Sequence, residues 1–367
     1  PSLGSWAFLR ILRCGHVAIC DLEMRSCWPT GIYIEDSWDI AIDRIKVEGG
    51  AYPIFARDTQ AKNPCTRNIA VRGSSWVQDP RLWHEIPWED AHHSAGPYAY
   101  LNGAMLGTAD VIGDLEFSAN SVTDAFNALR FDISARLARE FPEEVARRNR
   151  NIFVHGNRFL RIRDNVLEPE CWAFNMHFHR NVVVDAHAPL SLDGVGGGFW
   201  YIYGNVFRFK TRQGSKGAKS RGGKIVKLAG YPSYPSRDWF FLNNSIYCRS
   251  SLFGDGDEGE VPIWSLTAHD NAIAGCDPEL PDPASVDDPA CQTCVDAFAG
   301  KFGVRTGTTF SGTLTNIASW RYALCRMGIV EEGPELLDPK SPVFVDAPGC
   351  PPQAPCRPPA RPRRPGI

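Results

Sequence analysis

The stretch Val154-His-Gly-Asn157-Arg-Phe159 contains the pattern that decides the fold: an asparagine with one apolar residue three positions before it and another two positions after it. The pattern returns around five further residues, Asn120, Asn181, Asn205, Asn244 and Asn271. Asn157, Asn181 and Asn205 follow one another at intervals of 24 residues, and the other intervals are longer. A recurring period of this length is typical of a solenoid, in which each repeat packs only on its neighbours.

Each asparagine is expected at a bend between two short strands of one coil. There its side-chain amide can hydrogen-bond the asparagine of the next coil, which satisfies a buried polar group. Asparagine also tolerates the left-handed backbone conformation that such a bend requires. Strand-like alternation in residues 14–20, 31–35, 39–45 and 68–73 extends the pattern toward the N-terminus and predicts about nine coils. Residues 135–150 alone look helical, and Pro142 interrupts them.

The domain organisation follows from the repeat and not from the length. A chain of 367 residues suggests two or three domains by size alone. The repeat predicts instead one elongated all-β domain over residues 1–275. Residues 276–347 are then an extension that packs on or caps it, and residues 348–367 are a Pro- and Arg-rich tail.

Charge and hydropathy limit the partners. The formal net charge is −3, which excludes a generally basic nucleic-acid binder. Residues 201–237 carry nine Lys and Arg and no acidic residue, whereas residues 255–296 are rich in Asp and Glu and contain no Lys or Arg. The basic residues are not interleaved with aromatic ones, so no nucleic acid is expected. The sequence has no run of eighteen apolar residues, so no membrane span is expected either, and the chain is predicted to be a monomer.

The cysteines predict the compartment. The chain has twelve of them, an even number in loop-rich surroundings, which favours disulfides and a secreted or periplasmic protein. A zinc knuckle is the alternative, because Cys291-Gln-Thr-Cys294 has ligand spacing. A second such pair does not follow it.

Alignment of the coils places side chains in columns along the solenoid. Two apolar columns should face the core, because side chains alternate along a strand; they contain Leu129, Leu167, Leu190 and Val226, and then Phe131, Pro169, Leu192 and Leu228. Two polar columns between them should face solvent; they contain Arg130, Glu168, Ser191 and Lys227, and then Asp132, Glu170, Asp193 and Ala229. Just before these strands, the same alignment stacks Asp164 under His187.

The stacked carboxylates are the candidate site. Like charges opposite each other in a sheet are destabilising and raise one another's pKa. The arrangement is therefore expected to bind a cation or to perform acid–base chemistry. The alternative is a solvated charged face that Arg130 and Lys227 neutralise. The basic segment beside the column offers Arg212, Arg221 and Lys224, which can clamp an anionic polymer or merely balance nearby acids.

The element order and the asparagine pattern resemble the right-handed parallel β-helix (pectate lyase-like) superfamily of polysaccharide-active proteins. The resemblance covers residues 14–273, and Arg163-Asp164-Asn165-Val-Leu-Glu168-Pro-Glu170 is similar to a stretch that recurs in bacterial β-helix proteins. It implies a single-stranded right-handed parallel β-helix with loop insertions, together with a polysaccharide partner. It implies no particular substrate, because this superfamily hosts several activities.

Three functions remain open. A glycoside hydrolase, the preferred hypothesis, needs no cofactor and would use Glu170 as the general acid and Asp193 or Asp132 as base or nucleophile. A polysaccharide lyase or epimerase acting on a uronate polymer would hold Ca²⁺ with Asp132, Glu168, Glu170 and Asp193 and use Lys227 as base. A non-catalytic glycan-binding or structural β-helix is the third. Contacts to the substrate are expected from Asp164, His187, Arg130, Lys224, Arg212 and Arg221.

Overall fold

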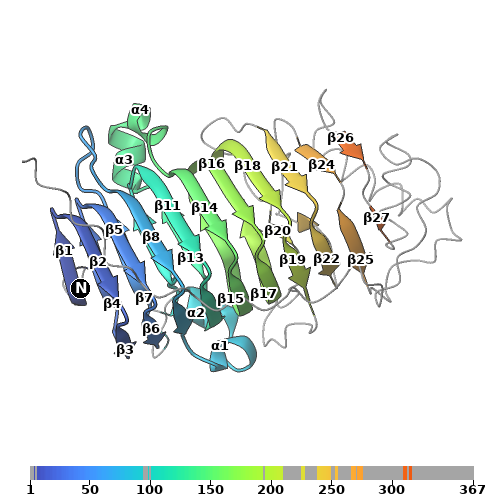
Figure 1. The fold of residues 1–367 in the computed structure, drawn as a ribbon, viewed down its shortest axis with the longest axis horizontal. Coiled ribbons are helices and arrows are strands. Elements are labelled where there is room, and N and C mark those ends of the chain that lie inside the picture. Colours follow the sequence, from blue (N-terminus) through green and yellow to red (C-terminus); the bar gives the residue numbers. More distant parts are fainter. Residues whose placement is uncertain are drawn as a thin grey trace, which may run out of the picture.

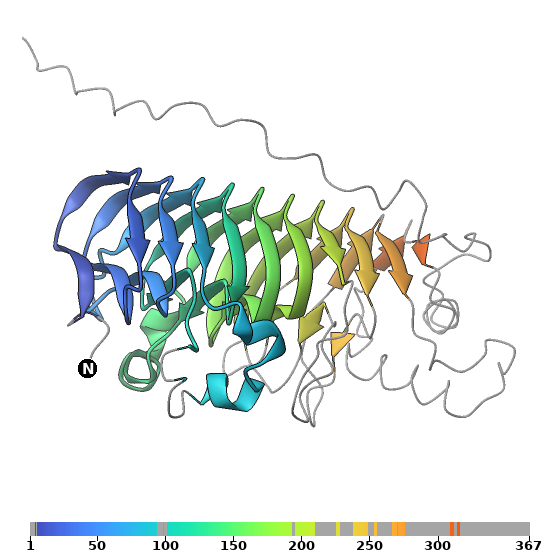
Figure 2. The same ribbon diagram turned by 90° about the horizontal axis from the view of Figure 1, so that it is seen from below.

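The protein is a parallel β-solenoid. The computed structural model describes residues 4, 6–93, 98, 101–192, 195–209, 225–227, 238–248, 253–254, 266–269, 271–275, 309–311 and 314–315. Two sheets of 17 and 10 strands run along the long axis of the molecule, and every strand pairing in the described ranges is parallel (Figure 1). The coils follow one another along that axis (Figure 2), as the asparagine pattern predicts.

The smaller sheet takes one strand from each coil, so its ten strands mark ten coils in the described part of the chain. Its strands are β2 (Gly15–Cys20), β5 (Trp38–Asp43), β8 (Arg67–Arg72), β11 (Gly113–Ser118), β14 (Arg150–His155), β16 (Trp172–His179), β18 (Gly196–Tyr203), β21 (Trp239–Leu242), β24 (Leu266–His269) and β26 (Thr309–Ser311).

The larger sheet combines the strands before and after these. The preceding ones are β1 (Ala7–Leu12), β4 (Thr30–Glu35), β7 (Tyr52–Arg57), β10 (Leu106–Ala109), β13 (Leu129–Asp132), β20 (Val226–Lys227) and β23 (Phe253–Gly254). The following ones are β3 (Glu23–Arg25), β6 (Lys46–Glu48), β9 (Ser75–Val77), β12 (Ser121–Ala125), β19 (Val206–Arg208), β22 (Ser245–Cys248), β25 (Ala272–Gly275) and β27 (Leu314–Thr315).

Two long strands join these rows into one sheet. The first half of β15 (Arg158–Pro169) pairs with β12 and its second half pairs with β13. The strand β17 (Val182–Ser191) likewise pairs with β19 and then with β20. Both strands therefore turn the corner between two faces of the solenoid without a break, where the other coils have a loop.

The predicted asparagine ladder is confirmed. The side-chain Nδ2 of Asn157 donates to Oδ1 of Asn181 at 2.9 Å, and Nδ2 of Asn181 donates to Oδ1 of Asn205 at 3.2 Å. Each ladder amide also donates to a backbone carbonyl of an earlier coil, as Asn157 does to Phe117 at 2.8 Å. The ladder thus satisfies buried polar groups on both sides of each bend.

The predicted left-handed conformation, however, lies one residue earlier than expected. Positive φ angles occur at the residues that precede the ladder asparagines, namely Ala119, Gly156, Arg180, Gly204 and Asn243. The ladder position requires asparagine for its side-chain amide. The backbone N–H and the side-chain Nδ2 of Asn157 both donate to Oδ1 of Asn181 in the next coil. The backbone reversal is completed before that position is reached.

The core is built from apolar columns inside the coils. The rings of Phe117, Phe159, Phe178 and Phe207 follow one another in a stack with centroids 6.3–6.4 Å apart. All four are fully buried, and burial of each such side chain contributes roughly 1.5–3 kcal/mol. The predicted core column Leu129, Leu167, Leu190 and Val226 is also buried.

In the part of the chain that the structure describes, four short helices interrupt the solenoid. The helices α1 (Arg81–His84) and α2 (Trp88–His92) belong to the insertion before β10, and α3 (Ala135–Glu140) and α4 (Pro142–Val145) follow β13. They project from the body of coils (Figures 1 and 2). The predicted break at Pro142 is confirmed, since α4 begins there. Within the described ranges, no helix has the length and hydropathy needed to cross a membrane.

Strand pairing continues past the expected boundary at residue 275, because β26 and β27 pair with β24 and β25. The tail at 348–367 lies outside the described residues.

The prediction of disulfides is not supported by the cysteines that the structure describes. Cys14, Cys27, Cys65 and Cys171 are free thiols, and burial raises the pKa of Cys171 to about 11. The cysteines from Cys276 onward lie outside the described residues.

Candidate functional site

The predicted register of the first polar column is confirmed. Arg130 of β13 is paired with Glu168 of β15, and Ser191 of β17 is paired with Lys227 of β20. The pairing of Leu167 with Leu190 aligns these two halves of the column. The sequence alignment of coils therefore places these four side chains correctly relative to one another.

The expectation that this column faces open solvent is wrong. The side chain of Glu168 is only 13% exposed and that of Arg130 is 26% exposed, while Ser191 is buried. Asn127 links Glu168 to the insertion before β10. Its Asn102 accepts a hydrogen bond from Nδ2 of Asn127 at 3.5 Å, and that same Nδ2 donates to Oε2 of Glu168 at 2.8 Å.

The second column brings Asp132 and Glu170 together. The backbone N–H of Glu170 donates to the carbonyl of Phe131 at 2.8 Å, which sets Glu170 beside Asp132 on the neighbouring strand. Burial and the charge of Glu170 raise the pKa of Asp132 to about 6, although Arg130 opposes the shift. The predicted third member, Asp193, lies outside the described residues.

Arg130 is the centre of the cluster. Its Nη2 lies 3.0 Å from Oε1 of Glu170, and its Nε lies 3.7 Å from Oε2 of Glu168. Burial lowers the pKa of Arg130, but the negative charges of Glu168, Glu170 and Asp132 outweigh burial and raise it overall. This guanidinium therefore stays charged and orders the carboxylates around it.

Glu168 is the most deeply buried carboxyl group of the cluster. Burial is the main reason that its pKa lies well above the usual range, and the charge of Asp164 raises it further. Arg130 and Lys227 act in the opposite direction. The sequence analysis chose Glu170 as the general acid because of its central place in the column. In the structure Glu168 is the carboxyl group whose pKa burial raises, whereas Glu170 reaches solvent with 38% of its side chain exposed.

Tyr52 and Gly107 complete the site and were missed by the sequence analysis. Gly107 of β10 is paired with Arg130, and a β-carbon at position 107 would lie 2.6 Å from Cε1 of Tyr52. The ring of Tyr52 therefore lies across β10 and reaches toward Arg130, whose charge lowers the pKa of the Tyr52 hydroxyl while burial raises it more. The signal in the sequence is the glycine itself, at a strand position that faces the charged column.

Asp164 and His187 are both buried, with exposures of 3% and 7%. They occupy the corner that β15 and β17 turn, where the register shifts between Ile162 and Asn165. Their contact with substrate stays a prediction, and Asp164 acts on the site through its charge on Glu168.

The other predicted substrate contacts, Arg212, Arg221 and Lys224, lie outside the described residues. Lys227, predicted as the base of a lyase, is described, and its charge lowers the pKa of Glu168. The two tryptophans of the insertion, Trp83 and Trp88, are buried, so they pack the insertion and do not offer open faces to a sugar.

Among the predicted calcium ligands, Asp132, Glu168 and Glu170 do not bring their carboxylate oxygens within 4.8 Å of one another, and Asp193 lies outside the described residues. In the described part of the chain, only Asp36, Asp58 and Cys65 bring potential ligand atoms within 4.8 Å of one another. The carboxylates of that group already accept hydrogen bonds from the loop after β7, as Asp58 does from the backbone N–H groups of Cys65 and Thr66 at 2.7 Å. In the acidic cluster the guanidinium of Arg130 occupies the place between Glu168 and Glu170 that a cation would take.

Two cavities lie away from this cluster. One, of about 290 Å³, is lined by residues of the first coil. The other, of about 410 Å³, is lined by Pro64, Ile112 and Arg147, among others. The acidic cluster lines neither cavity.

No protein-family model matches this chain, and no curated protein matches it either.

Proposed function

We propose that the protein is a glycoside hydrolase that cleaves a polysaccharide lying across the strands β13, β15 and β17. The observation that carries the proposal is the pair Glu168 and Glu170, two carboxyl groups in different environments on either side of Arg130. Glycoside hydrolysis needs one protonated carboxylic acid and one carboxylate. Burial keeps a proton on Glu168, and the ion pair with Arg130 suits Glu170 to the carboxylate role.

In the proposed reaction, Glu168 donates its proton to the glycosidic oxygen as the bond from that oxygen to the anomeric carbon breaks. Glu170 takes a proton from a water molecule whose oxygen attacks the anomeric carbon. The water attacks the face of the sugar opposite the leaving oxygen in a single displacement, so inversion is the expected stereochemical outcome.

A neutral polymer is the expected substrate. Four acidic residues contribute to the site, Asp132, Asp164, Glu168 and Glu170, against two basic ones, Arg130 and Lys227. An anionic polymer would be repelled by the remaining negative charge, which favours hydrolysis over the calcium-assisted lyase or epimerase mechanism. The proposal includes a secreted location and a right-handed winding of the coils, since parallel β crossovers are right-handed in nearly all proteins.

The test is incubation of the full chain with neutral polysaccharides (β-glucan, xylan, mannan) and with polygalacturonate and alginate. New reducing ends without ultraviolet absorbance are expected from a neutral polymer, and Glu168→Gln should lower the rate by roughly 10²–10⁴-fold. Glu116→Gln, on the smaller sheet in an ion pair with Arg72, is the matched control. Absorbance from unsaturated ends would show a lyase, and an unchanged rate in Glu168→Gln would overturn the assignment.

A further inference from the structure

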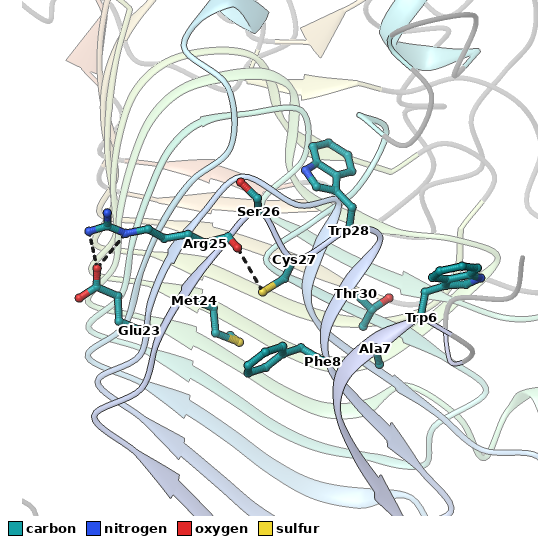
Figure 3. A pocket seen from close by; sticks show the side chains of 10 residues that line it. All are labelled: Trp6, Ala7, Phe8, Glu23, Met24, Arg25, Ser26, Cys27, Trp28 and Thr30. Carbon is teal, nitrogen blue, oxygen red and sulfur yellow. Dashed lines mark hydrogen bonds and ion pairs between the residues drawn. The ribbon is translucent and has the colours of Figure 1, made fainter.

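The cavity of about 290 Å³ lies on the first coil, at the corner where β3 leads into β4 (Figure 3). Its size is at the lower end of the range of ligand pockets, roughly 300–1,000 Å³, and suits one or two rings. Trp6, Phe8, Trp28 and Thr30 line it together with the ion pair of Glu23 and Arg25.

The aromatic residues of this cavity are unusually open. Trp6 is 63% exposed, Phe8 is 65% exposed and Trp28 is 40% exposed. Single exposed apolar residues are ordinary, but three aromatic rings around one cavity form a patch that marks a binding site. They also differ from the exposed aromatic rows of the smaller sheet. There Phe153, His177 and Tyr201 stack on one another 4.6–5.0 Å apart, so their faces are already covered.

The cavity also contains an unsatisfied polar group. The hydroxyl of Thr30 is buried and has no hydrogen-bond partner among the described residues. In Figure 3 this hydroxyl points toward Trp6. A buried hydroxyl without a partner costs about 1–3 kcal/mol, so a ligand that supplies one is favoured. The ion pair between Nη2 of Arg25 and Oε1 of Glu23, at 2.6 Å, adds donors and acceptors at the other end of the cavity.

We propose that this cavity binds a neutral sugar ring of a glycan. A pyranose has an apolar face of C–H groups that stacks on an indole ring, and hydroxyls around its edge that bond Thr30, Glu23 and Arg25. An apolar segment of another protein would cover the tryptophans but leave the Thr30 hydroxyl unpaired. The inference does not depend on the proposed hydrolase, because it rests on residues 6–8 and 23–30 alone.

The test is titration of the full chain with cellohexaose, xylohexaose, mannohexaose and chitohexaose, followed by calorimetry and by chemical shifts of the tryptophan indole N–H groups. One of these sugars should bind, and Trp28→Ala and Trp6→Ala should each weaken binding at least tenfold. Thr30→Val keeps the shape of the side chain and removes only the hydroxyl, and should weaken binding about three- to tenfold. Phe153→Ala, an exposed aromatic residue elsewhere, is the control and should change nothing.

The inactive variant Glu168→Gln should bind these sugars as the unmodified chain does, which separates this site from the proposed catalytic one. Binding by none of the sugars would overturn the proposal, and so would binding that survives both tryptophan substitutions. Self-association that Trp6→Ala abolishes, seen by light scattering in the absence of sugar, would identify a second copy of the chain as the occupant and would also overturn it.

Discussion

The ring of Tyr52 lies across the backbone of Gly107, so closely that a β-carbon at position 107 would lie 2.6 Å from Cε1 of the ring. Gly107 is paired with Arg130 on the next strand, and Arg130 binds Glu170 at 3.0 Å. The missing side chain at position 107 therefore lets an aromatic ring from β7 reach the acidic cluster on β13 and β15. Tyr52 is thereby brought into electrostatic contact with Arg130.

Replacement of Gly107 by Ala should displace Tyr52. Overpacking of this kind costs typically 1–3 kcal/mol of unfolding free energy, and any activity on polysaccharide should fall because Arg130 loses its neighbour. Urea unfolding measures the first effect and the rate of reducing-end formation the second. In the double variant Gly107→Ala/Tyr52→Ala the clash is absent, so its destabilisation should be smaller than the sum of the single ones. Additive effects would mean that the two residues do not meet.

Arg130→Met should destabilise the protein strongly, because it leaves Glu168, Glu170 and Asp132 without their counter-ion. Loss of one partner from a buried ion pair costs about 3–5 kcal/mol. The loss should be greater at pH 8 than at pH 5, because Asp132, whose pKa is raised to about 6, is largely protonated at the lower pH. Arg72→Met is the control, because the Arg72–Glu116 pair is more exposed and should cost at most about 1 kcal/mol. Equal losses in the two variants would contradict the central role of Arg130.

Stability should fall as pH rises through the titration of Asp132. The pKa of this group is raised from 3.8 to about 6 in the folded chain, so between these values the unfolded chain releases its proton first. Ionisation then favours unfolding, and the free energy of unfolding should drop by roughly 3 kcal/mol between about pH 4 and pH 6.5. Asp132→Asn cannot ionise and should remove this part of the pH dependence. Denaturant titrations at four or five pH values measure the slope of both proteins.

The register of the candidate site was predictable from sequence because two local rules act together. The equal spacing of Asn157, Asn181 and Asn205 sets the coil length, and strand alternation then fixes the faces. From these rules alone Arg130 falls opposite Glu168, as the structure has it. The same rules place the apolar columns in the core.

The burial of the site was not predictable in this way. Glu168 accepts a hydrogen bond from Asn127, which also bonds Asn102 of an insertion outside the repeat, and alignment of coils contains no information about such a segment. The corner at Asp164 and His187 was also missed. An extended strand through a corner follows the same alternation as two strands with a bend between them, so the pattern does not distinguish them. The ring of Tyr52 can lie against position 107 only because Gly107 has no side chain there. Alignment of the coils does not show which neighbouring side chain takes up the space that a glycine leaves.

Replacement of one ladder asparagine should lower the free energy of unfolding more than replacement of a neighbouring charged residue on the surface. Asn157→Ala leaves the carbonyl of Phe117 and the backbone N–H of Asn120 without partners in a buried place. The expected loss is about 3 kcal/mol of unfolding free energy. Arg158→Ala, one residue further along and exposed, should change stability by less than about 0.5 kcal/mol. If the two variants unfolded at the same urea concentration, the ladder would have no special part in stability.

The cavity of the first coil and the acidic cluster lie on one row of strands, which predicts a dependence on the length of the glycan. From β4, which carries Thr30, the row passes through β7 and β10 to Arg130 on β13. Arg130 is in register with Tyr33, three residues beyond Thr30 on β4. Three steps of about 4.8 Å between strands and three residues of about 3.3 Å along the strand give a distance of about 17 Å between them. A glycan held at both places spans several sugar rings, and a trisaccharide does not.

Trp28→Ala should therefore raise KM for a polymer several-fold while kcat stays unchanged, because the lost contact stabilises substrate and transition state equally. The same variant should cleave a trisaccharide as fast as the unmodified chain does. An equal loss on both substrates would show that the tryptophan supports the fold of the site instead of binding a remote part of the glycan.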